Sequence, residues 1–475
     1  MKKVTIIYDD IIEVTPRIKT IIGKNSYGDI VLKRKSLFTS FSQIINDSKI
    51  DCQIIRINNK KDLDDLLLKN FDDKIIFHYF SNNPISKVKE FELFLKKIEY
   101  SNDNFIVSNN SIVGLIFSKS NDYQMFLNNY KENKNIEDYI SYEKLEIDAC
   151  LDISLYQNLL YYITGGFDAR YFNQISGDEY TVVKNSQDKK KIKMEYMYYQ
   201  LLPDEMKSWI VMPYNYVEQD NKASYTMERM PMTDIAIRWT HKAIEKEELL
   251  AILEKSFHFI NKRPSKKVSK EEYNKISNKL YIEKLDDRVK KLKNLPEYKK
   301  IKLLIQSGTE YNDIDEIIAI YKELYYKLIS KDKLNEMVIG HGDLFFANML
   351  YSKELNMLKL IDPKGALEEK DLWMHPYYDI AKLSHSICGN YDFFNTDGFS
   401  ILLNKEMKFD LQIHFDNKEY VELFKNELVK NNYNYELVRI YEASLFLSML
   451  PLHIDNPQKV FGFILNALNI LKELR

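Results

Sequence analysis

Two carboxylates and a carboxamide follow one another at short spacing in the second half of this 475-residue chain. Asp343 stands in a His-Gly-Asp triplet, Asn348 comes five residues later, and Asp362 follows the apolar run 357–361. A carboxylate such as Asp343 can accept the proton of an attacking hydroxyl, and the oxygens of Asn348 and Asp362 suit Mg²⁺. The set predicts phosphoryl transfer, in which the protein mainly positions metal, nucleotide phosphates and acceptor.

The residues between Asn348 and Asp362 predict the element that brings these two side chains together. Two short apolar runs, 348–352 and 357–361, flank the polar turn 353–356. This pattern is typical of a β-hairpin. A hairpin would return Asp362 to the loop that carries the other two side chains.

An upstream segment offers groups for the nucleotide phosphates. Gly165 and Gly166 stand between two apolar runs, 159–163 and 171–175. Because glycine has no side chain, backbone amides there could approach phosphate oxygens closely. A glycine pair also occurs in ordinary turns, so the elements that follow it decide between the two interpretations.

Those elements supply a cation and a carboxylate in order. The β-branched and aromatic run 180–184 predicts a strand ending in Lys184, and 187–202 predicts a helix. Lys184 is the candidate ligand of the α and β phosphates, and Glu195 on the helix is its candidate partner. A strand over 225–230 then leads into a candidate nucleotide-contacting hinge.

The chain from about 151 to 475 resembles the aminoglycoside phosphotransferase and choline kinase-like family. The resemblance rests on the His-Gly-Asp triplet, the asparagine after four further residues, the hydrophobic-Asp pair, and the upstream order of glycines, lysine and glutamate. It implies that Asp343 is the catalytic base and that His341, grouped with it, is a structural member of the catalytic loop. It also implies ATP as donor and Mg²⁺ bound by Asn348 and Asp362.

The resemblance further implies a fold and a nucleotide site. The fold class is α+β: a two-lobed protein-kinase-like fold, with a small antiparallel β lobe and a large helical lobe, preceded by an α/β domain. The expected domains are 1–150, 151–245 and 246–475. The residues expected around the nucleotide are Gly165, Gly166, Lys184 and Glu195 for the phosphates, and Glu228 and Met230 near the adenine.

The first 150 residues alternate short β-branched runs with helical patterns, which predicts an α/β layer fold. Its glycines do not form a phosphate-binding fingerprint. A likeness to sugar nucleotidyltransferase or glycosyltransferase folds is one hypothesis for this domain. Asp9-Asp10 after the first strand could bind a metal, although acidic residues at a strand end more often form a turn.

The composition of the chain argues against several classes of binding partner. A net charge of −2 and a pI near 6.5 give no electrostatic reason to bind nucleic acid or an anionic membrane. The sequence has no apolar run of about 18 residues, so we expect no membrane span. Three separated cysteines indicate neither a disulfide framework nor a zinc cluster, and they fit a cytoplasmic protein. The oligomeric state is not predicted.

Several other features allow two interpretations. The basic run 261–267 is either a solvated connection or a patch for an acidic or phosphorylated substrate, and Lys364 either neutralises a substrate anion or forms a turn. Asp379 is expected to cap a helix or brace the loop. The segment 401–474 is expected to be mainly helical, with an apolar core stripe. Aromatic residues near the site could line the acceptor pocket or belong to the core: Trp373, His375, Tyr377, Tyr378 and His385.

The leading hypothesis is an ATP- and magnesium-dependent kinase of a small-molecule hydroxyl, such as a sugar or an amino alcohol, with surface-polysaccharide metabolism as a candidate context. The triplet lacks the arginine of protein kinases, and no Ala-Pro-Glu segment follows Asp362, so a small molecule is preferred to a protein acceptor. Two alternatives are a bifunctional sugar-precursor transferase with a second active site in residues 1–150 and a non-catalytic kinase-like nucleotide-binding module.

Overall fold

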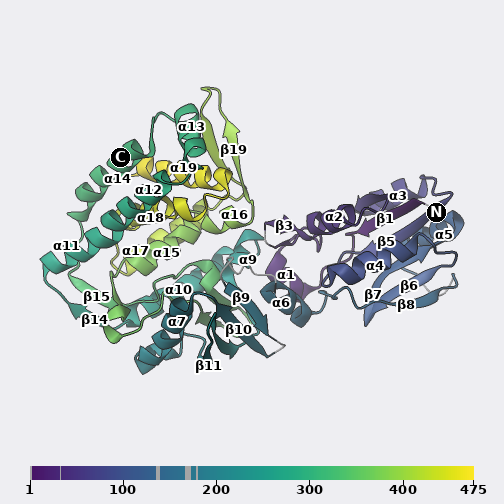
Figure 1. Ribbon diagram of the computed structural model, residues 1–475, viewed down its shortest axis with the longest axis horizontal. Helices are drawn as coiled ribbons and strands as arrows, with labels where there is room; N and C mark the ends of the chain where they lie inside the picture. The colour runs from purple at the N-terminus through teal and green to yellow at the C-terminus, as the bar shows by residue number, and fades with distance from the viewer. Residues whose placement is uncertain (1–2, 33, 135–139, 166–172, 178–179) are drawn as a thin grey trace. The chain divides into compact units, whose positions relative to one another are not determined.

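The chain forms two compact units, Met1–Asp168 and Ala169–Arg475 (Figure 1). The computed structural model describes residues 3–32, 34–134, 140–165, 173–177 and 180–475. Within this part of the chain, no helix combines the length and the apolarity needed to cross a bilayer.

The first unit is built on a six-stranded mixed sheet of order β4-β1-β5-β7-β6-β8. Strand β1 lies parallel to β4 and β5, whereas β7 runs antiparallel to β5 and β6. The predicted α/β architecture of the amino-terminal part is therefore present. The strands are β1 (Lys3–Asp9), β2 (Val31–Leu32), β3 (Lys35–Ser36), β4 (Cys52–Ile57), β5 (Lys74–Phe80), β6 (Phe105–Asn109), β7 (Ser111–Phe117) and β8 (Glu143–Glu146).

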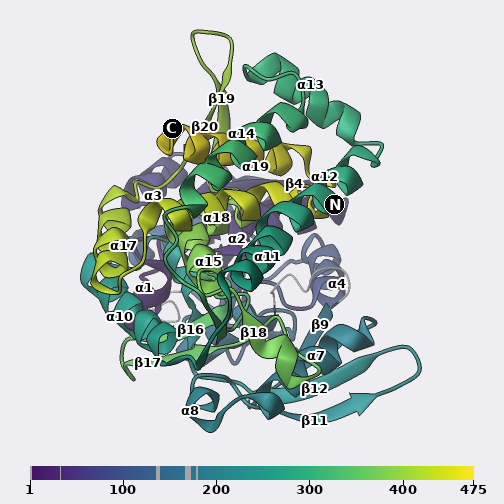
Figure 2. The same ribbon diagram turned by 90° about the vertical axis from the view of Figure 1, so that its left-hand side faces the viewer.

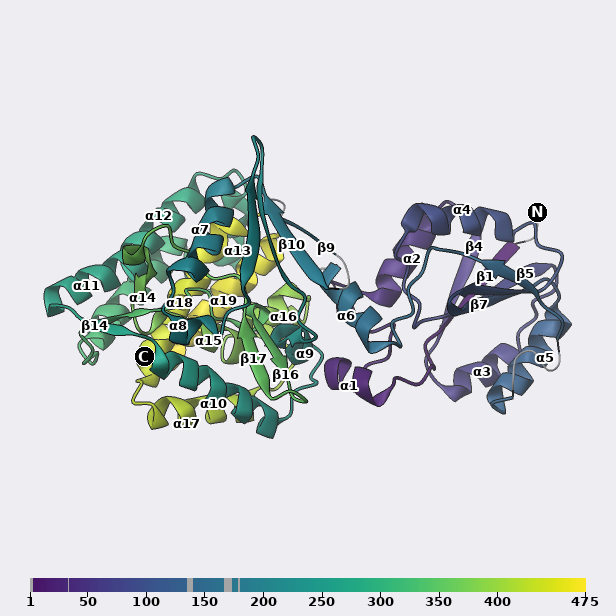
Figure 3. The ribbon, with the colours of Figure 1, turned by 90° about the horizontal axis from the view of Figure 1, so that it is seen from below.

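Helices cover both faces of this sheet (Figure 3). Ile6 of β1 belongs to the core under α2 and α4, and its neighbour Ile7 belongs to the core that includes residues of α3 and α5. Successive strand residues point to opposite faces, so one apolar strand can serve two layers. The helices are α1 (Pro16–Ile22), α2 (Leu37–Asp47), α3 (Lys60–Leu67), α4 (Val88–Ile98), α5 (Ser120–Lys131) and α6 (Tyr156–Gly165).

The segment before α6 belongs to the first unit. The amide of Leu151 donates to the carbonyl of Pro84 at 3.1 Å, and the amide of Ile153 donates to that of Asn82 at 2.8 Å. Residues 151–165 were expected in the small lobe, whereas these bonds and the contacts of α6 with α1 assign them to the first unit.

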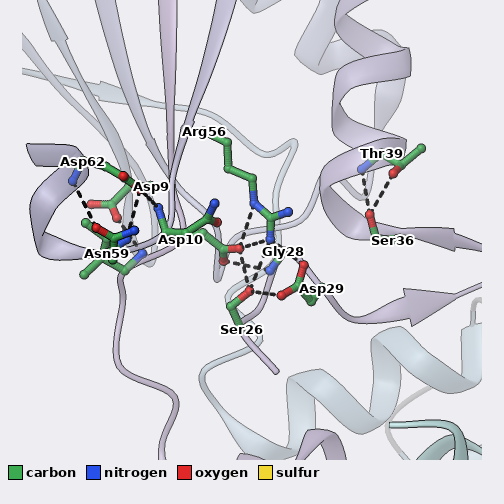
Figure 4. Close-up of polar contacts among 12 residues, drawn as sticks. Asp9, Asp10, Ser26, Gly28, Asp29, Ser36, Thr39, Arg56, Asn59 and Asp62 are labelled. Atoms are coloured by element: carbon green, nitrogen blue, oxygen red, sulfur yellow. Dashed lines mark hydrogen bonds and ion pairs between the residues drawn. The ribbon is translucent and has the colours of Figure 1, made fainter. Parts of the chain in front are cut away.

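The Asp9-Asp10 pair braces the end of β1 (Figure 4). The Asp10 carboxylate accepts the amide of Gly28 at 2.8 Å and forms an ion pair with Arg56, and Asp9 lies 2.9 Å from Nε2 of His78. Both carboxylates are buried. Among the described residues no group of three or more His, Cys, Asp or Glu side chains could hold a metal ion, so the turn interpretation fits the pair better.

A four-stranded antiparallel sheet, β11-β12-β10-β9, forms one end of the second unit. Helix α7 packs on it through Ile192, which contacts a core that includes Val211 and Tyr225. This part agrees with the predicted small β lobe. Its elements are β9 (Asn173–Gly177), β10 (Thr181–Ser186), α7 (Lys189–Leu201), α8 (Asp204–Lys207), β11 (Pro213–Glu218) and β12 (Ala223–Glu228).

Shorter strands connect this sheet with the helical part of the unit. The predicted hairpin is present as β16 and β17, and a second hairpin interrupts the segment 401–474, which was expected to be mainly helical. The strands are β13 (Thr233–Asp234), β14 (Ser265–Lys267), β15 (Glu336–Ile339), β16 (Met349–Ser352), β17 (Met357–Leu360), β18 (Trp373–Met374), β19 (Phe399–Leu403) and β20 (Phe409–Ile413).

The remainder is helical, and Figure 2 shows α13, α14 and α19 at the end of the unit away from β11 and β12. The predicted apolar stripe is buried, as Leu445, Leu450 and Ile464 show. The helices are α9 (Ile235–Thr240), α10 (Lys246–Lys262), α11 (Lys270–Asn278), the π-helix η2 (Lys279–Glu283), α12 (Lys284–Lys293), α13 (Tyr298–Gly308), α14 (Ile314–Ile329), the 3-10 helices η3 (Phe346–Asn348), η4 (Glu369–Leu372) and η5 (Leu450–Leu452), α15 (Tyr378–Ile387), α16 (Tyr391–Asn395), α17 (Lys418–Lys430), α18 (Tyr435–Met449) and α19 (Pro457–Glu473).

Candidate active site

Asp379 holds the loop that follows β15. Its carboxylate accepts the amide of His341 at 2.9 Å and the amide of Gly342 at 2.7 Å. Gly342 has a φ of +80°, and a Cβ there would lie 2.5 Å from Cβ of Lys364, so the turn requires glycine. Asp379 therefore acts as the loop brace that the sequence suggested.

Arg263 completes this brace from behind. Its side chain is 1 % exposed, Nη1 lies 2.9 Å from Oδ2 of Asp379, and Nη2 donates to the carbonyl of Pro376 at 3.2 Å. Both interpretations of the basic run 261–267 are wrong for this residue, which is neither solvated nor at the surface. Strand β14 pairs with β15 and brings Arg263 beneath the loop.

His341 links the loop to the β16–β17 hairpin. The ring is fully buried, Nε2 lies 2.9 Å from the carbonyl oxygen of Ile361, and Nδ1 faces the amide of Asp343 at 3.3 Å. Burial lowers the pKa of His341, and an amide donor at Nδ1 suits the neutral ring with its proton on Nε2. In this geometry His341 is a positioning residue.

Asn348 and Asp343 lie side by side. The carboxamide nitrogen of Asn348 donates to the carbonyl of Asp343 at 2.9 Å and to its Oδ2 at 3.2 Å. The amide of Ile361 donates to the carbonyl of Asn348 at 3.0 Å, so the hairpin returns Asp362 to this loop. No described residue donates a hydrogen bond to Oδ1 of Asn348.

Lys382 is a site residue that the sequence analysis missed. Its ammonium lies 2.8 Å from Oδ1 of Asp343 and 5.7 Å from the ring centroid of Phe345. Burial lowers the pKa of Lys382, but the Asp343 carboxylate outweighs it and the net shift is upward. Lys382 follows Asp379 by three residues on α15, a spacing that puts both on one face of a helix, and that spacing was the available signal.

Lys184 joins the two halves of the site. Its ammonium on β10 lies 2.8 Å from Oε2 of Glu195 on α7 and 2.7 Å from Oδ1 of Asp362 after β17. Tyr225 donates its hydroxyl to Glu195 at 3.0 Å. Lys184 and Glu195 are each 2 % exposed, and the two carboxylates raise the pKa of Lys184 although burial alone would lower it. Burial raises the pKa of Glu195, and Lys184 opposes that rise.

The segment after Asp362 is fixed to α7. Asp362 itself has a φ of +55°. Gly365 has a φ of +87°, and a Cβ there would lie 2.7 Å from the carbonyl carbon of Met194. The amide of Ala366 donates to the carbonyl of Met194 at 3.0 Å. Only glycine permits this approach, which aligns the helix of Glu195 with the strand end that carries Asp362.

The other residues predicted to bind the nucleotide have separate outcomes. Gly165 is the last residue of α6 in the first unit, and Gly166 lies outside the described residues, so the phosphate-loop hypothesis stays a prediction. Glu228 ends β12 and is exposed. Met230 is half-buried and packs on the core of the small sheet, to which Ile361 also contributes.

The aromatic residues near the site divide into two groups. His375 is fully buried among tyrosine rings and His385 stacks on Tyr391, so both belong to the core. Trp373 lies under Lys266 on the β15–β18 edge. Tyr378 is buried, and it lies close enough to the site for the charges of Lys382 and Asp343 to act on its hydroxyl.

Two buried carboxylates lie on elements that pack behind the loop of Asp343. Asp234 caps α9 through the amide of Ile237, and Asp392 lies on α16, which packs against α9. Burial raises the pKa of each to about 7, and the charge of Asp392 adds to the rise for Asp234. Both therefore titrate near neutral pH.

No family model matches the chain. Among curated proteins, "Protein kinase OspG" from Shigella flexneri and from Shigella sonnei is 35% identical over 108 residues, which are 22% of this chain and 50% of those proteins. The match thus spans about half the length of these relatives.

Solved structures of aminoglycoside phosphotransferases, the family that the motifs resemble, match about two-thirds of the chain. A thermostable mutant of APH(4)-Ia is 10% identical and matches 63% of this chain and 94% of its own, with a TM-score of 0.34. The streptomycin-ATP complex of APH(2")-IIa is 14% identical and matches 66% of this chain and 95% of its own, with a TM-score of 0.30. ADP-bound APH(2'')-Ib is 17% identical and matches 66% of this chain and 96% of its own, with a TM-score of 0.29.

Proposed function

We propose that the second unit is an ATP- and magnesium-dependent phosphotransferase with a protein-kinase-like arrangement, which moves the γ-phosphoryl group to a hydroxyl of a small molecule. One observation carries the proposal. Lys184 contacts both Glu195 and Asp362, so a strand cation, a helix carboxylate and a hairpin-end carboxylate meet beside the loop of Asp343. Phosphoryl transfer needs this set of groups around a nucleotide.

In this proposal each side chain has one task. Lys184, held by Glu195, binds α- and β-phosphate oxygens. The acceptor oxygen attacks the γ-phosphorus, its proton passes to Asp343, and the bond to the bridging oxygen breaks to release the nucleoside diphosphate. Lys382 compensates the charge of Asp343 and holds its carboxylate in place. His341 and Asp379 keep the loop in position.

The donor set fits Mg²⁺. Asp362 offers its second carboxylate oxygen and Asn348 its carboxamide oxygen, and both are hard donors of the kind that Mg²⁺ prefers. The hydrogen bond between Ile361 and Asn348 keeps the two residues adjacent. When bound, Mg²⁺ would neutralise phosphate charge next to Lys184.

The acceptor class rests on the sequence of the loop. The His-Gly-Asp triplet and the absence of an Ala-Pro-Glu segment favour a small hydroxyl compound over a protein. The curated relatives are named as protein kinases, so a protein acceptor belongs in the test. None of the matched proteins named above has a polysaccharide function in its name.

The decisive experiment measures nucleotide use by the full chain. Purified protein with MgATP labelled at the γ position is incubated with sugars, sugar phosphates, amino alcohols, nucleosides and a protein mixture, and label transfer is followed. We expect transfer to one small-molecule class. Label found only on protein would refute the proposed acceptor class. Absence of MgATP binding in calorimetry would refute the proposal that the chain is an ATP-dependent phosphotransferase.

A matched pair of variants connects this activity to the site. Lys184→Met removes the buried ammonium, whereas Lys193→Met removes an exposed one on α7. We expect the first to lower kcat/KM by at least about 100-fold, because a phosphate loses its charge-assisted hydrogen bonds. The second should retain full activity. Equal activity of both variants would contradict the role of Lys184.

A further inference from the structure

The ammonium of Lys284 contacts the hydroxyl of Tyr378, and the charges of two further lysines near Asp343, Lys382 and Lys364, also act on this hydroxyl. Nζ of Lys284, on α12, donates to this hydroxyl at 3.3 Å. Lys382 comes from the same helix as Tyr378, and Lys364 comes from the segment after β17. All three cations favour the ionised form of Tyr378: burial raises its pKa, yet together they bring the net shift below the ordinary value.

The positive charge of this cluster exceeds its negative charge. Asp343 pairs with Lys382, but no carboxylate of the described residues lies within 4.0 Å of the ammonium of Lys284 or Lys364. Lys322 of α14, in the same helical region, has such a partner in Asp286 at 2.7 Å. Among the described residues, two cations beside the proposed base therefore have no carboxylate partner.

We propose that the phosphoryl acceptor is itself an anion: a hydroxyl compound whose phosphate or carboxylate group binds Lys284 and Lys364, assisted by the Tyr378 hydroxyl. This inference rests on the proposed function and names its substrate class. Anions gain most where several donors converge, because each hydrogen bond to a charged group is strong and the field of neighbouring cations adds to it. A polycationic acceptor would meet like charges at the same place.

The position of the cluster also explains how the anion would serve the reaction. Lys364 is joined to the catalytic loop, because its amide donates to the carbonyl of His341 at 2.9 Å, and Lys382 contacts Asp343 directly. An anion held here fixes the acceptor hydroxyl near the base. The anionic group takes no part in the chemistry: the hydroxyl gains the phosphoryl group, its proton goes to Asp343, and the nucleoside diphosphate leaves.

Matched acceptors test the charge requirement. Glucose, glucose 6-phosphate and gluconate, and likewise glycerol, glycerol 3-phosphate and glycerate, are compared with MgATP as donor. Each charge-assisted hydrogen bond is worth a factor of roughly 10 to 100, so we expect at least one anionic compound to exceed its neutral parent by about 100-fold in kcat/KM. The phosphate and carboxylate arms tell which anion is bound.

Variants locate the effect. Lys284→Met and Lys364→Met should each raise the KM for the anionic acceptor by roughly 10- to 100-fold and leave the KM for MgATP unchanged. Lys291→Met, an exposed position on the same helix as Lys284, is the control and should change neither. A rise in the KM for MgATP instead would show that the two lysines bind the nucleotide and would overturn the proposal.

A binding measurement separates this inference from the proposed function. Glycerol 3-phosphate, glucose 6-phosphate and gluconate are titrated into protein saturated with a non-hydrolysable ATP analogue and magnesium. Binding that is lost in the Lys284→Met/Lys364→Met double variant supports the inference. If the analogue binds but none of the three anions does, or if only neutral or cationic acceptors are phosphorylated, this inference fails and the phosphotransferase proposal stands. If the analogue does not bind, the proposed function itself fails.

Discussion

Replacing Glu195 by Gln tests whether the buried ion pair prepares Lys184 for a nucleotide. The carboxamide keeps the size of the side chain and can still accept the Tyr225 hydroxyl, so the change is mainly the loss of one charge. Lys184 would then have only Asp362 as a partner, at 2.7 Å. Because Asp362 is also the proposed metal ligand, the variant should draw the ammonium and the metal ligand toward each other.

The magnitude follows from the geometry. At 2.8 Å and an effective dielectric constant of about 20, the attraction between Lys184 and Glu195 is about 6 kcal/mol before desolvation is subtracted. Removing one partner of a buried pair costs roughly 3–5 kcal/mol when the other charge is left alone. Since Asp362 remains, we expect the free energy of unfolding to fall by about 2–3 kcal/mol, which lowers the melting temperature by about 3–5 °C.

The assay is thermal unfolding with and without MgATP, combined with calorimetric titration of the nucleotide. The transition of the second unit is identified by its upward shift with MgATP. We expect about 10-fold weaker nucleotide binding by Glu195→Gln, which corresponds to about 1.4 kcal/mol, and no change for the exposed Glu205→Gln. A Glu195→Gln variant with unchanged stability and affinity would show that this pair does not prepare Lys184.

Three further predictions concern the other carboxylates. Asp343→Asn should reduce turnover by roughly 10²–10⁴-fold without weakening MgATP binding, because only the proton acceptor is lost; full activity would remove Asp343 from this role. Asp362→Ala should weaken nucleotide binding in magnesium more than in EDTA, as measured by calorimetry, and equal losses would argue against a metal ligand. The raised pKa of Asp392, about 7 in the folded chain and about 3.9 unfolded, makes the native state bind more protons between these pH values, so stability falls as pH rises through this window. The Asp392→Asn variant should therefore have a larger free energy of unfolding than the parent at pH 8, by up to about 4 kcal/mol. Denaturant titrations at several pH values should show that its stability depends less on pH than that of the parent. An unchanged pH dependence would refute the assignment.

The part of the site that the sequence predicted is the part built from neighbouring elements. Lys184 on a strand and Glu195 on the next helix lie close because each element packs on the other, and the hairpin between Asn348 and Asp362 is set by local apolar and polar residues. Order along the chain is then enough to place the side chains.

The missed part is built by tertiary contacts. Arg263 and Asp379 are 116 residues apart, and a buried arginine inside a basic run has the same local pattern as a solvated one. Lys382 meets Asp343 only because α15 packs beneath the loop. By contrast, the β19–β20 hairpin could have been predicted from the sequence, since apolar residues alternate from Phe409 to Ile413 with the period of a strand.

The Arg263–Asp379 brace has a consequence for how this protein can change over evolutionary time. A shift of the loop would pull its two amides from Asp379 and leave this buried carboxylate with Arg263 as its remaining partner, and the loss of two hydrogen bonds to a charged group costs several kcal/mol. The base is therefore confined to one place, whereas the ammonium groups of Lys284 and Lys364 have no carboxylate partner among the described residues. New acceptors would be acquired by substituting those two side chains around an immobile reaction centre.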